Sequence, residues 1–305
     1  MKKFLKNIIA FSILAVIAGE VVVRMTHAMS DIPQRTIDKY GIQKYYPNQE
    51  GYWKGGDHKW TINELGWAGE LPSSYNNLIT IIGDSFIENF MNPNECHQSA
   101  YLEEKMETYN FMEAGRSGVS LIEAMEISKN MDSLQPVKTL VYVNNNDFYE
   151  SIREVKLMED ITQLNLKDSS IAYGKMKAPG LKKVLYTWKL LYYFYNRFPL
   201  FVQSNNTEAV IENKVDEYEN QLKSKLEIFQ LIDYISNTYN ITKTTLVFHP
   251  NCNIEIIKKC KTAGFGVIVL DSSKDETSWS FEYDSHWTCY GHERAAQQVA
   301  NALLK

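Results

Sequence analysis

The sequence predicts an α/β domain built as a three-layer, doubly wound parallel sheet of about five strands. Five short runs of apolar and β-branched residues each stop at a turn residue: NLITII, TYNFME, VKTLVYV, TTLVF and GVIVL. Helix-like segments alternate with them, at 100–107, 121–131, 214–237, 254–263 and 292–304. This alternation is typical of a parallel sheet covered on both faces. Ligands of such sheets bind at the carboxyl ends of the strands, so the residues after each run are the candidates for a site.

Residues 1–28 are predicted to be a signal peptide or an N-terminal membrane anchor. The lysines of MKKFLKN precede an apolar run from Ile8 to Gly19, which is the order of an export signal. Val21 to Val23 would extend the run toward a spanning helix of about 20 residues if Glu20 is tolerated there. We favour a retained anchor over cleavage near Ala28. Either alternative places the rest of the chain outside the cytoplasm, because the lysines stay inside.

Two further parts are expected. Residues 29–76 are polar and aromatic with turn signals, and they predict an extended lead-in on the surface of a domain that spans 77–305. That domain carries a helical insertion at about 150–213, which contains LKKVLYTWKLLYYFYNRFPLFV. Lys189, Asn196 and Arg197 argue against a membrane-spanning helix there. We expect an aromatic helix packed over the edge of the sheet, and a lid or membrane-surface helix is the alternative.

Composition excludes one class of partner. The 305-residue chain has a net charge of -5 and no cluster of Lys and Arg, which argues against binding to nucleic acid. Its four cysteines are compatible with an oxidising compartment. Cys252 and Cys260 flank a predicted short helix and are either a disulfide pair or small buried apolar residues.

The first predicted strand ends in Gly83-Asp84-Ser85. These are turn-forming residues, so a simple turn explains them. The alternative is that Ser85 is a nucleophile at the carboxyl end of a central strand. The second strand ends at Gly115, whose N–H could donate to a developing oxyanion. The third is followed by Asn146, an amide donor of the kind that a tetrahedral oxyanion requires.

Near the C-terminus, YDSHW places Asp284 two residues before His286. In an extended turn the two side chains could point the same way. A hydroxyl is a poor nucleophile until a base takes its proton, and a carboxylate stabilises the charged form of that base. Asp284 and His286 therefore suit Ser85 as orienting acid and general base.

Together, these four blocks resemble the SGNH (GDSL-type) hydrolase superfamily. The resemblance covers about residues 77–302 without the insertion, and it looks closest to the membrane-anchored or exported bacterial branch, with TINELGWAGE before the nucleophile strand. It implies a flavodoxin-like SGNH fold. It also implies that Ser85 is the nucleophile, that the Ser85 N–H, Gly115 and Asn146 form the oxyanion hole, and that His286 and Asp284 complete a triad. The family usually spaces the acid three residues before the histidine, so Glu282 and Asp271 are alternative acids.

The resulting hypothesis is a serine esterase that acts through an acyl-enzyme on a carbohydrate ester outside the cytoplasm, with no cofactor. An O-acyltransferase for an envelope or exported polysaccharide and a non-catalytic glycan-binding protein are the alternatives. A metal site built from His249, Cys252, His286, Cys289 and His292 is a further rival, but these residues form no closed zinc pattern, and no metal is expected.

Overall fold

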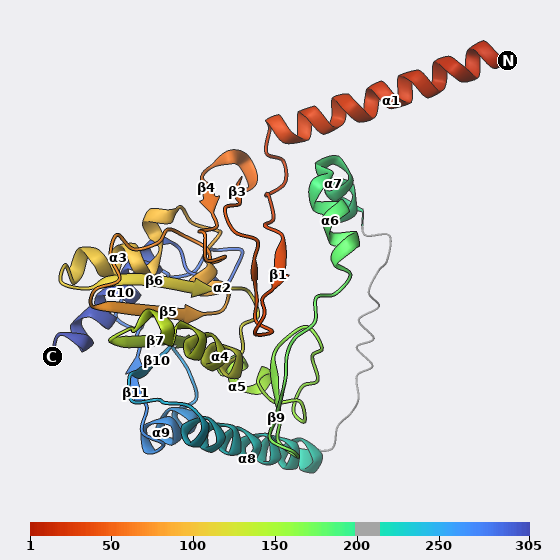
Figure 1. Ribbon diagram of the computed structural model, residues 1–305. Coiled ribbons are helices and arrows are strands. Elements are labelled where there is room, and N and C mark those ends of the chain that lie inside the picture. Colours follow the sequence, from red (N-terminus) through yellow and green to blue (C-terminus); the bar gives the residue numbers. More distant parts are fainter. Residues whose placement is uncertain (199–213) are drawn as a thin grey trace.

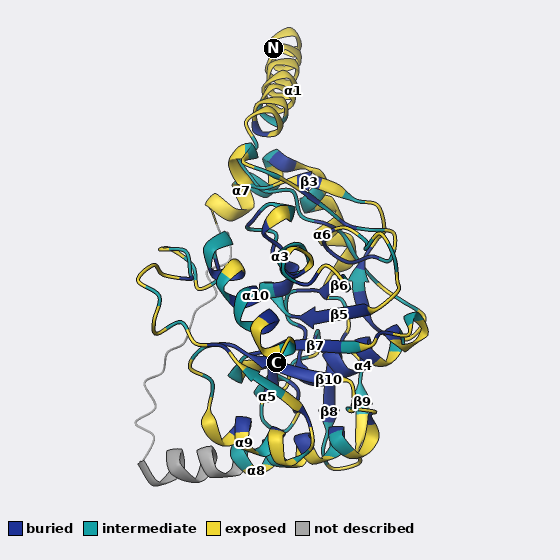
Figure 2. Cartoon of the chain, turned by 90° about the vertical axis from the view of Figure 1, so that its left-hand side faces the viewer, coloured by how far each residue is buried: buried dark blue, intermediate teal, exposed yellow. Residues whose placement is uncertain are grey.

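The structure is a computed structural model that describes residues 1–198 and 214–305, with the backbone alone for 214–223. The last residues of the predicted insertion, 199–213, lie outside the described residues. Helix α1 (Lys2–Met25) projects from the body of the protein and is exposed along most of its length (Figures 1 and 2). Among the described residues it is the one helix long and apolar enough to cross a membrane, with a mean hydropathy of 2.2, and a signal sequence would have the same properties.

The predicted sheet is confirmed. Five parallel strands lie in the order β11-β10-β7-β5-β6 (Figure 1). They are β5 (Leu78–Gly83), β6 (Asn110–Gly115), β7 (Lys138–Val143), β10 (Thr244–Phe248) and β11 (Gly266–Val269). The chain pairs β6 on one side of β5 and then continues on the other side with β7. The order therefore reverses between β5 and β7, and the carboxyl ends of these two strands are where such sheets bind ligands.

Alternate residues of the strands face two separate cores, as the two-residue period of a strand requires. Leu78 and Ile82 of β5 pack in a core with helices α4 (Leu121–Met131), α8 (Lys214–Thr238) and α9 (Ile254–Thr262). Ile79 and Ile81 of the same strand pack with α3 (Gln98–Lys105) and α10 (Cys289–Leu303). Helices thus cover both faces, which completes the three layers.

The lead-in is more deeply integrated than an extended surface segment. It forms two antiparallel strand pairs, β1 (Arg35–Ile37) with β2 (Gln43–Tyr45) and β3 (Glu50–Tyr52) with β4 (Lys59–Thr61), and a short turn of helix, η1 (Lys54–Gly56). Tyr45, Trp60 and Ile62 build a small core of their own. Ile42 and Trp67 join the main core, so the lead-in is part of the domain's packing.

The insertion follows α5 (Asn145–Glu150) and differs from expectation. It starts with a hairpin, β8 (Gln163–Asn165) and β9 (Ser170–Ala172), and continues with helices α6 (Pro179–Thr187) and α7 (Lys189–Arg197). We expected an aromatic helix over the edge of the sheet. Instead, α6 and α7 lie beside the C-terminal end of α1, away from the sheet (Figure 1). The physical reason is that α1 offers hydrogen-bond acceptors and a small residue to α7, as described below.

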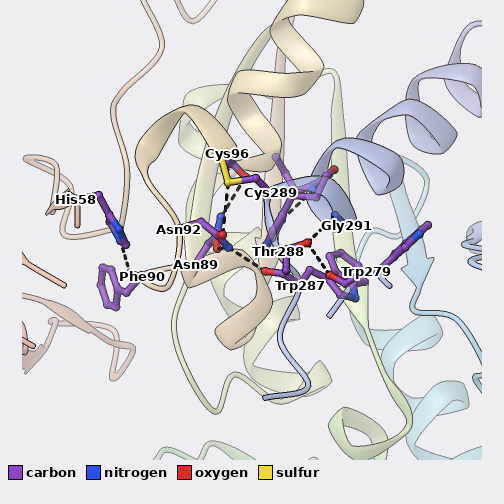
Figure 3. Close-up of a disulfide and its surroundings, with 12 residues drawn as sticks. His58, Asn89, Phe90, Asn92, Cys96, Trp279, Trp287, Thr288, Cys289 and Gly291 are labelled. Atoms are coloured by element: carbon purple, nitrogen blue, oxygen red, sulfur yellow. Dashed lines mark hydrogen bonds between the residues drawn. A yellow bond between two sulfur atoms is a disulfide. The ribbon is translucent and has the colours of Figure 1, made fainter. Parts of the chain in front are cut away.

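The cysteines pair differently from the Cys252–Cys260 alternative. Cys96, in the short helix η2 (Asn94–Cys96), forms a disulfide with Cys289 at the start of α10 (Figure 3). Cys252 is free and half-buried, and Cys260 is free and fully buried in the main core. Cys260 therefore has the role of a small apolar side chain.

Candidate active site

Ser85 lies at the carboxyl end of β5, where it begins the short helix α2 (Ser85–Glu88). Asp84 caps this helix, because its carboxylate accepts a hydrogen bond of 3.0 Å from the Phe86 N–H. Gly83 permits the sharp turn: a Cβ on this residue would lie 2.6 Å from Ile87 Cγ1. As the first residue of α2, Ser85 has a backbone N–H with no partner inside the helix.

A chain of hydrogen bonds links Ser85 to the loop before α10. Ser85 Oγ lies 2.7 Å from His286 Nε2, and His286 Nδ1 lies 2.5 Å from Asp284 Oδ1. The same carboxylate oxygen accepts the His286 backbone N–H at 2.9 Å. The structure thus brings together three side chains that are up to 201 positions apart in sequence.

The carboxylate next to His286 is that of Asp284. The backbone N–H of His286, followed by its imidazole, holds the pKa of Asp284 below its ordinary value, so the group is ionised at neutral pH. Neither alternative acid is bonded to this imidazole. Asp271 accepts the Ser273 N–H instead, and Glu282 is exposed.

Small molecules can reach the three side chains. Ser85, Asp284 and His286 are all partly exposed, whereas Trp287, which packs against the Phe86 ring, is buried. The Phe86 ring lies 4.9 Å from the imidazole of His286 and 5.1 Å from the ring of Trp287, measured between centroids. One side of the imidazole therefore rests on an apolar wall while the hydroxyl stays open to solvent.

The disulfide and a set of polar contacts hold the loop that carries His286. Asn92 Nδ2 donates to the Trp287 carbonyl at 2.9 Å, and the Thr288 N–H donates to the Trp279 carbonyl at 2.7 Å (Figure 3). The disulfide with Cys96 fixes Cys289, which lies two residues after Trp287. His286 thus stands on a segment that is tied covalently to the region just after α2.

The end of β7 is organised by Asn144, which sequence reasoning did not single out. Its side chain accepts the Asn146 N–H at 2.7 Å and donates to Asp84 at 3.1 Å, while Asp147 accepts the Asn144 N–H at 2.7 Å. Asn144 therefore joins the first turn of α5 to the turn that presents Ser85. The Asn-x-x-Asp spacing is that of a capping box, and this signal could have identified the residue.

Two acids in this region are buried. Burial raises the pKa of Asp84 to about 6, against the opposing effect of the Phe86 N–H. Burial, followed by the charge of Asp84, raises the pKa of Asp147 well above its ordinary value. Neither carboxyl is bonded to His286, so we assign both a structural place: Asp84 caps α2, and Asp147 accepts the Asn144 N–H.

Asn146 and Gly115 are the other two predicted donors. Asn146 is exposed in the first turn of α5, so its side-chain amide is free to meet a ligand. Gly115 is buried, and a Cβ on it would lie 2.3 Å from the Glu88 backbone nitrogen of α2. Because the Arg116 N–H donates to the Gly83 carbonyl, the alternation of a parallel ladder turns the Gly115 N–H away from β5. Packing explains why this residue is a glycine, and its role as an oxyanion donor stays a prediction.

His249, at the end of β10, lies behind the site. Its ring centroid is 4.4 Å from that of Phe86 and 4.5 Å from that of Trp287. Burial, with a smaller effect of His286, lowers the pKa of His249 to about 3, and its Nε2 has no partner within the described residues. His249 is therefore a neutral ring that packs against Phe86 and Trp287, the aromatic residues next to the site.

The residues of the rival metal site do not come together. Cys289 forms the disulfide with Cys96, and His292 is buried, with its Nδ1 3.1 Å from Gln98 Nε2. The described residues contain no cluster of three or more potential metal ligands.

Comparisons with known proteins give distant likenesses in structure alone. No protein-family model matches the sequence, and no curated protein is significantly similar to it. A Desulfitobacterium hafniense protein assigned to the lipolytic G-D-S-L family is similar at 12% identity, 74% coverage of this chain, 99% of that chain and a TM-score of 0.38. The psychrotrophic esterase EstA from Pseudoalteromonas sp. is similar at 11% identity, with 75% of this chain and 97% of that chain covered and a TM-score of 0.36. A member of the lipolytic G-D-S-L family from Veillonella parvula is similar at 11% identity, with 75% of this chain and 98% of that chain covered and a TM-score of 0.36. Likenesses this distant do not establish an activity.

Proposed function

We propose that this chain is a serine esterase of the SGNH type that acts through an acyl-enzyme intermediate. One observation carries the proposal: Ser85 Oγ, His286 and Asp284 form a continuous hydrogen-bonded chain at the carboxyl edge of a parallel sheet, with the hydroxyl accessible. A base bonded to the nucleophile, and an acid bonded to that base, are the two contacts that such catalysis requires.

The reaction proceeds in two steps. Ser85 Oγ attacks the carbonyl carbon of an ester while His286 Nε2 takes the hydroxyl proton. Asp284 holds the other imidazole proton on Nδ1 and stabilises the imidazolium. His286 then gives its proton to the departing alkoxide, which leaves the acyl group on Ser85. A water molecule, activated by the same base, releases the acid and restores the serine.

Two donors are proposed for the oxyanion. The Ser85 N–H belongs to the first turn of α2, and the side-chain amide of Asn146 belongs to the first turn of α5. The Asn144 side chain is hydrogen-bonded to both turns, to Asp84 and to the Asn146 N–H, so it positions the two donors relative to each other. Preorganised donors of this kind lower the barrier of acyl transfer by about 3 kcal/mol each.

We place the domain outside the cytoplasm, held by α1. The apolar helix after an N-terminal lysine cluster supports export. The Cys96–Cys289 disulfide supports the same location independently, because disulfides persist in oxidising compartments.

A carbohydrate O-acyl group is the proposed substrate. A cavity of about 330 Å³ adjoins the site and is bounded by Phe86, Ser285 and Trp287, which flank the triad residues in sequence. Most of the remaining wall is polar: it includes four hydroxyl residues together with Asp275, Asn251 and His249, and the hydroxyls are those of Ser272, Thr277, Ser278 and Ser280. Such a lining suits a polar, hydroxylated group better than a long acyl chain.

The test is turnover of a small acetyl ester and of an O-acetylated oligosaccharide by the wild type and Ser85→Ala. We expect the variant to lose activity on both, while Ser133→Ala, an exposed serine remote from the site, keeps it. A wild type that turns over neither ester, but binds glycan with or without Ser85, would favour the binding-protein alternative. Acyl label that moves to polysaccharide, instead of appearing as free acid, would identify a transferase.

A further inference from the structure

The N-terminus of α7 is bonded to α1. Glu20, the acid within the apolar helix, accepts the N–H groups of Leu190 at 2.7 Å and Lys189 at 3.1 Å. Both are among the N–H groups that a helix leaves unpaired at its start. Glu20 therefore caps α7 from a different helix, which explains an acidic residue inside an apolar run.

Three more contacts fix the same junction. Arg24 of α1 donates to the Thr187 carbonyl at 2.6 Å, between α6 and α7. Leu190 packs on Gly19 of α1, where a Cβ would lie only 3.0 Å from the leucine side chain. Lys189 is nearly buried and pairs with Asp31 of the lead-in at 2.6 Å. The polar groups of this junction are thus bonded to one another, and Glu20 and Lys189 are largely enclosed while Arg24 stays half exposed.

The outward side of α6 and α7 is apolar, and no residue in the described part of the chain covers it. Seven large apolar or aromatic side chains are between 48% and 62% exposed: Leu181, Val184, Trp188, Leu191, Phe194, Tyr195 and Phe198. Within each helix they are spaced three or four positions apart, so α6 and α7 each carry an apolar stripe, and the two helices are in contact on either side of the extended residue Trp188. A contiguous patch of this kind marks a surface that contacts a protein or a membrane.

Charge and position indicate which of these it is. Lys182, Lys183 and Arg197 are exposed on the same two helices, which is the pairing of apolar face and cations found in interfacial helices. In Figure 1 both helices lie beside the end of α1 nearest the domain, and Figure 2 also places α7 at the base of α1. Glu20 lies five residues before the end of α1 (Lys2–Met25), so the junction stands near the end of that helix from which the domain continues.

From these contacts we infer that α6 and α7 lie on the outer surface of the bilayer that α1 spans, with the stripe inserted at the boundary of headgroups and acyl chains. The inference rests on the membrane anchoring proposed above. It adds that α1 is retained, since cleavage near Ala28 would remove Glu20 and Gly19 from α7. It also fixes the catalytic domain close to the membrane, instead of leaving it free on a tether.

Trp188, which is 52% exposed at the junction of α6 and α7, is the reporter for the experiment. The full chain is reconstituted into vesicles of phosphatidylcholine and phosphatidylglycerol, with bromine near the headgroup end of the acyl chains. Co-flotation with the vesicles and the intact mass first establish that α1 is present and inserted. We expect the bromolipid to quench more tryptophan emission in the wild type than in Trp188→Phe.

A charged substitution provides the matched comparison. Leu191→Glu places a carboxylate in the stripe and should reduce the quenching of Trp188, whereas Leu226→Glu, at an exposed leucine of α8, should leave it unchanged. Failure to co-float would overturn the anchoring itself. Full co-flotation with equal quenching in the wild type and Trp188→Phe would overturn only the present inference. So would a detergent-stable dimer that Leu191→Glu dissociates, because a second copy would then cover the stripe.

Discussion

The carboxyl edge of the sheet and the junction of α1 with α6 and α7 satisfy their polar groups in the same way but present opposite surfaces. At the sheet edge, Ser85, His286 and Asp284 bond to one another and stay open to water. At the junction, Glu20 and Lys189 bond inward, and the apolar side chains are left outside. Leaving apolar surface exposed to water costs about 25 cal/mol of free energy per Å², relative to burying it.

The difference teaches which environment each region is built for. The first region exposes the proposed nucleophile and base, so it suits a reaction with a water-soluble group. The second leaves apolar surface uncovered, so it suits a non-aqueous neighbour. The following predictions separate the two regions, from the largest expected effect to the smallest.

Replacing His286 by Gln should have the largest effect, because it removes the base from Ser85. We expect kcat/KM for a small ester to fall by about 10⁴-fold or more, and by about 10²-fold for Asp284→Asn, which keeps the imidazole but weakens its orientation. Asp284 is partly exposed, so solvent replaces some of its effect. Steady-state kinetics check both values, and equal losses would mean that Asp284 is as essential as the base.

Breaking the disulfide should destabilise the loop that carries His286. The bond closes a separation of 193 residues, and its loss should cost about 2–4 kcal/mol of unfolding free energy. Thermal unfolding of Cys96→Ser/Cys289→Ser in detergent, with Cys252→Ser as the control, measures this. Reductant should lower the midpoint of the wild type and of the control but not that of the double variant. A wild type whose Cys96 alkylates without reductant would contradict the bond.

His249 should make the fold sensitive to acid. Burial lowers its pKa from 6.5 to about 3, so below pH 6.5 the unfolded chain binds a proton that the folded chain does not. Stability therefore falls as the pH drops from 6.5 toward 3. Between pH 7.5 and 5 the loss is about 2 kcal/mol for this residue. His249→Gln should remove this contribution to the loss of stability. The difference between the unfolding midpoints at pH 7.5 and pH 5 should then be smaller than in the wild type. An unchanged difference would contradict the buried neutral ring.

The smallest effect is expected from the exposed apolar side chains of α7. Leu191→Glu should leave kcat/KM for a soluble acetyl ester within about twofold of the wild type, because surface changes remote from a site rarely alter it. The same kinetic assay measures this. A large loss in solution would mean that α7 belongs to the active site, and the division between the two regions would fail.

Much of this arrangement could be predicted from sequence because strand ends are local signals. The five apolar runs and their turn residues located the sheet, and parallel strands bring their carboxyl ends to one edge. The fold therefore predicts that Ser85 lies at this edge, whereas the position of His286 also depends on the loop between β11 and α10, because β10 and β7 separate β11 from β5. The His–Asp contact was also accessible, since Asp284 is only two residues from the base.

The remaining features depend on contacts between distant segments, which no local pattern encodes. Cys96 meets Cys289 because α3 packs against α10, and Glu20 meets Leu190 across 170 positions. The direction of the Gly115 N–H depends on the register of β5 and β6, which decides whether residue 115 or 116 faces β5. In each case the residue type was visible, but its partner was not.

The most direct measurement traps the nucleophile. The full chain is treated with a fluorophosphonate, which reacts with activated serine hydroxyls, and the adduct is located by mass spectrometry. The account predicts a single adduct on Ser85 that is absent from His286→Gln, because the hydroxyl is activated only by the imidazole 2.7 Å away. An adduct on another serine, or equal labelling of Ser85 in the variant, would contradict it.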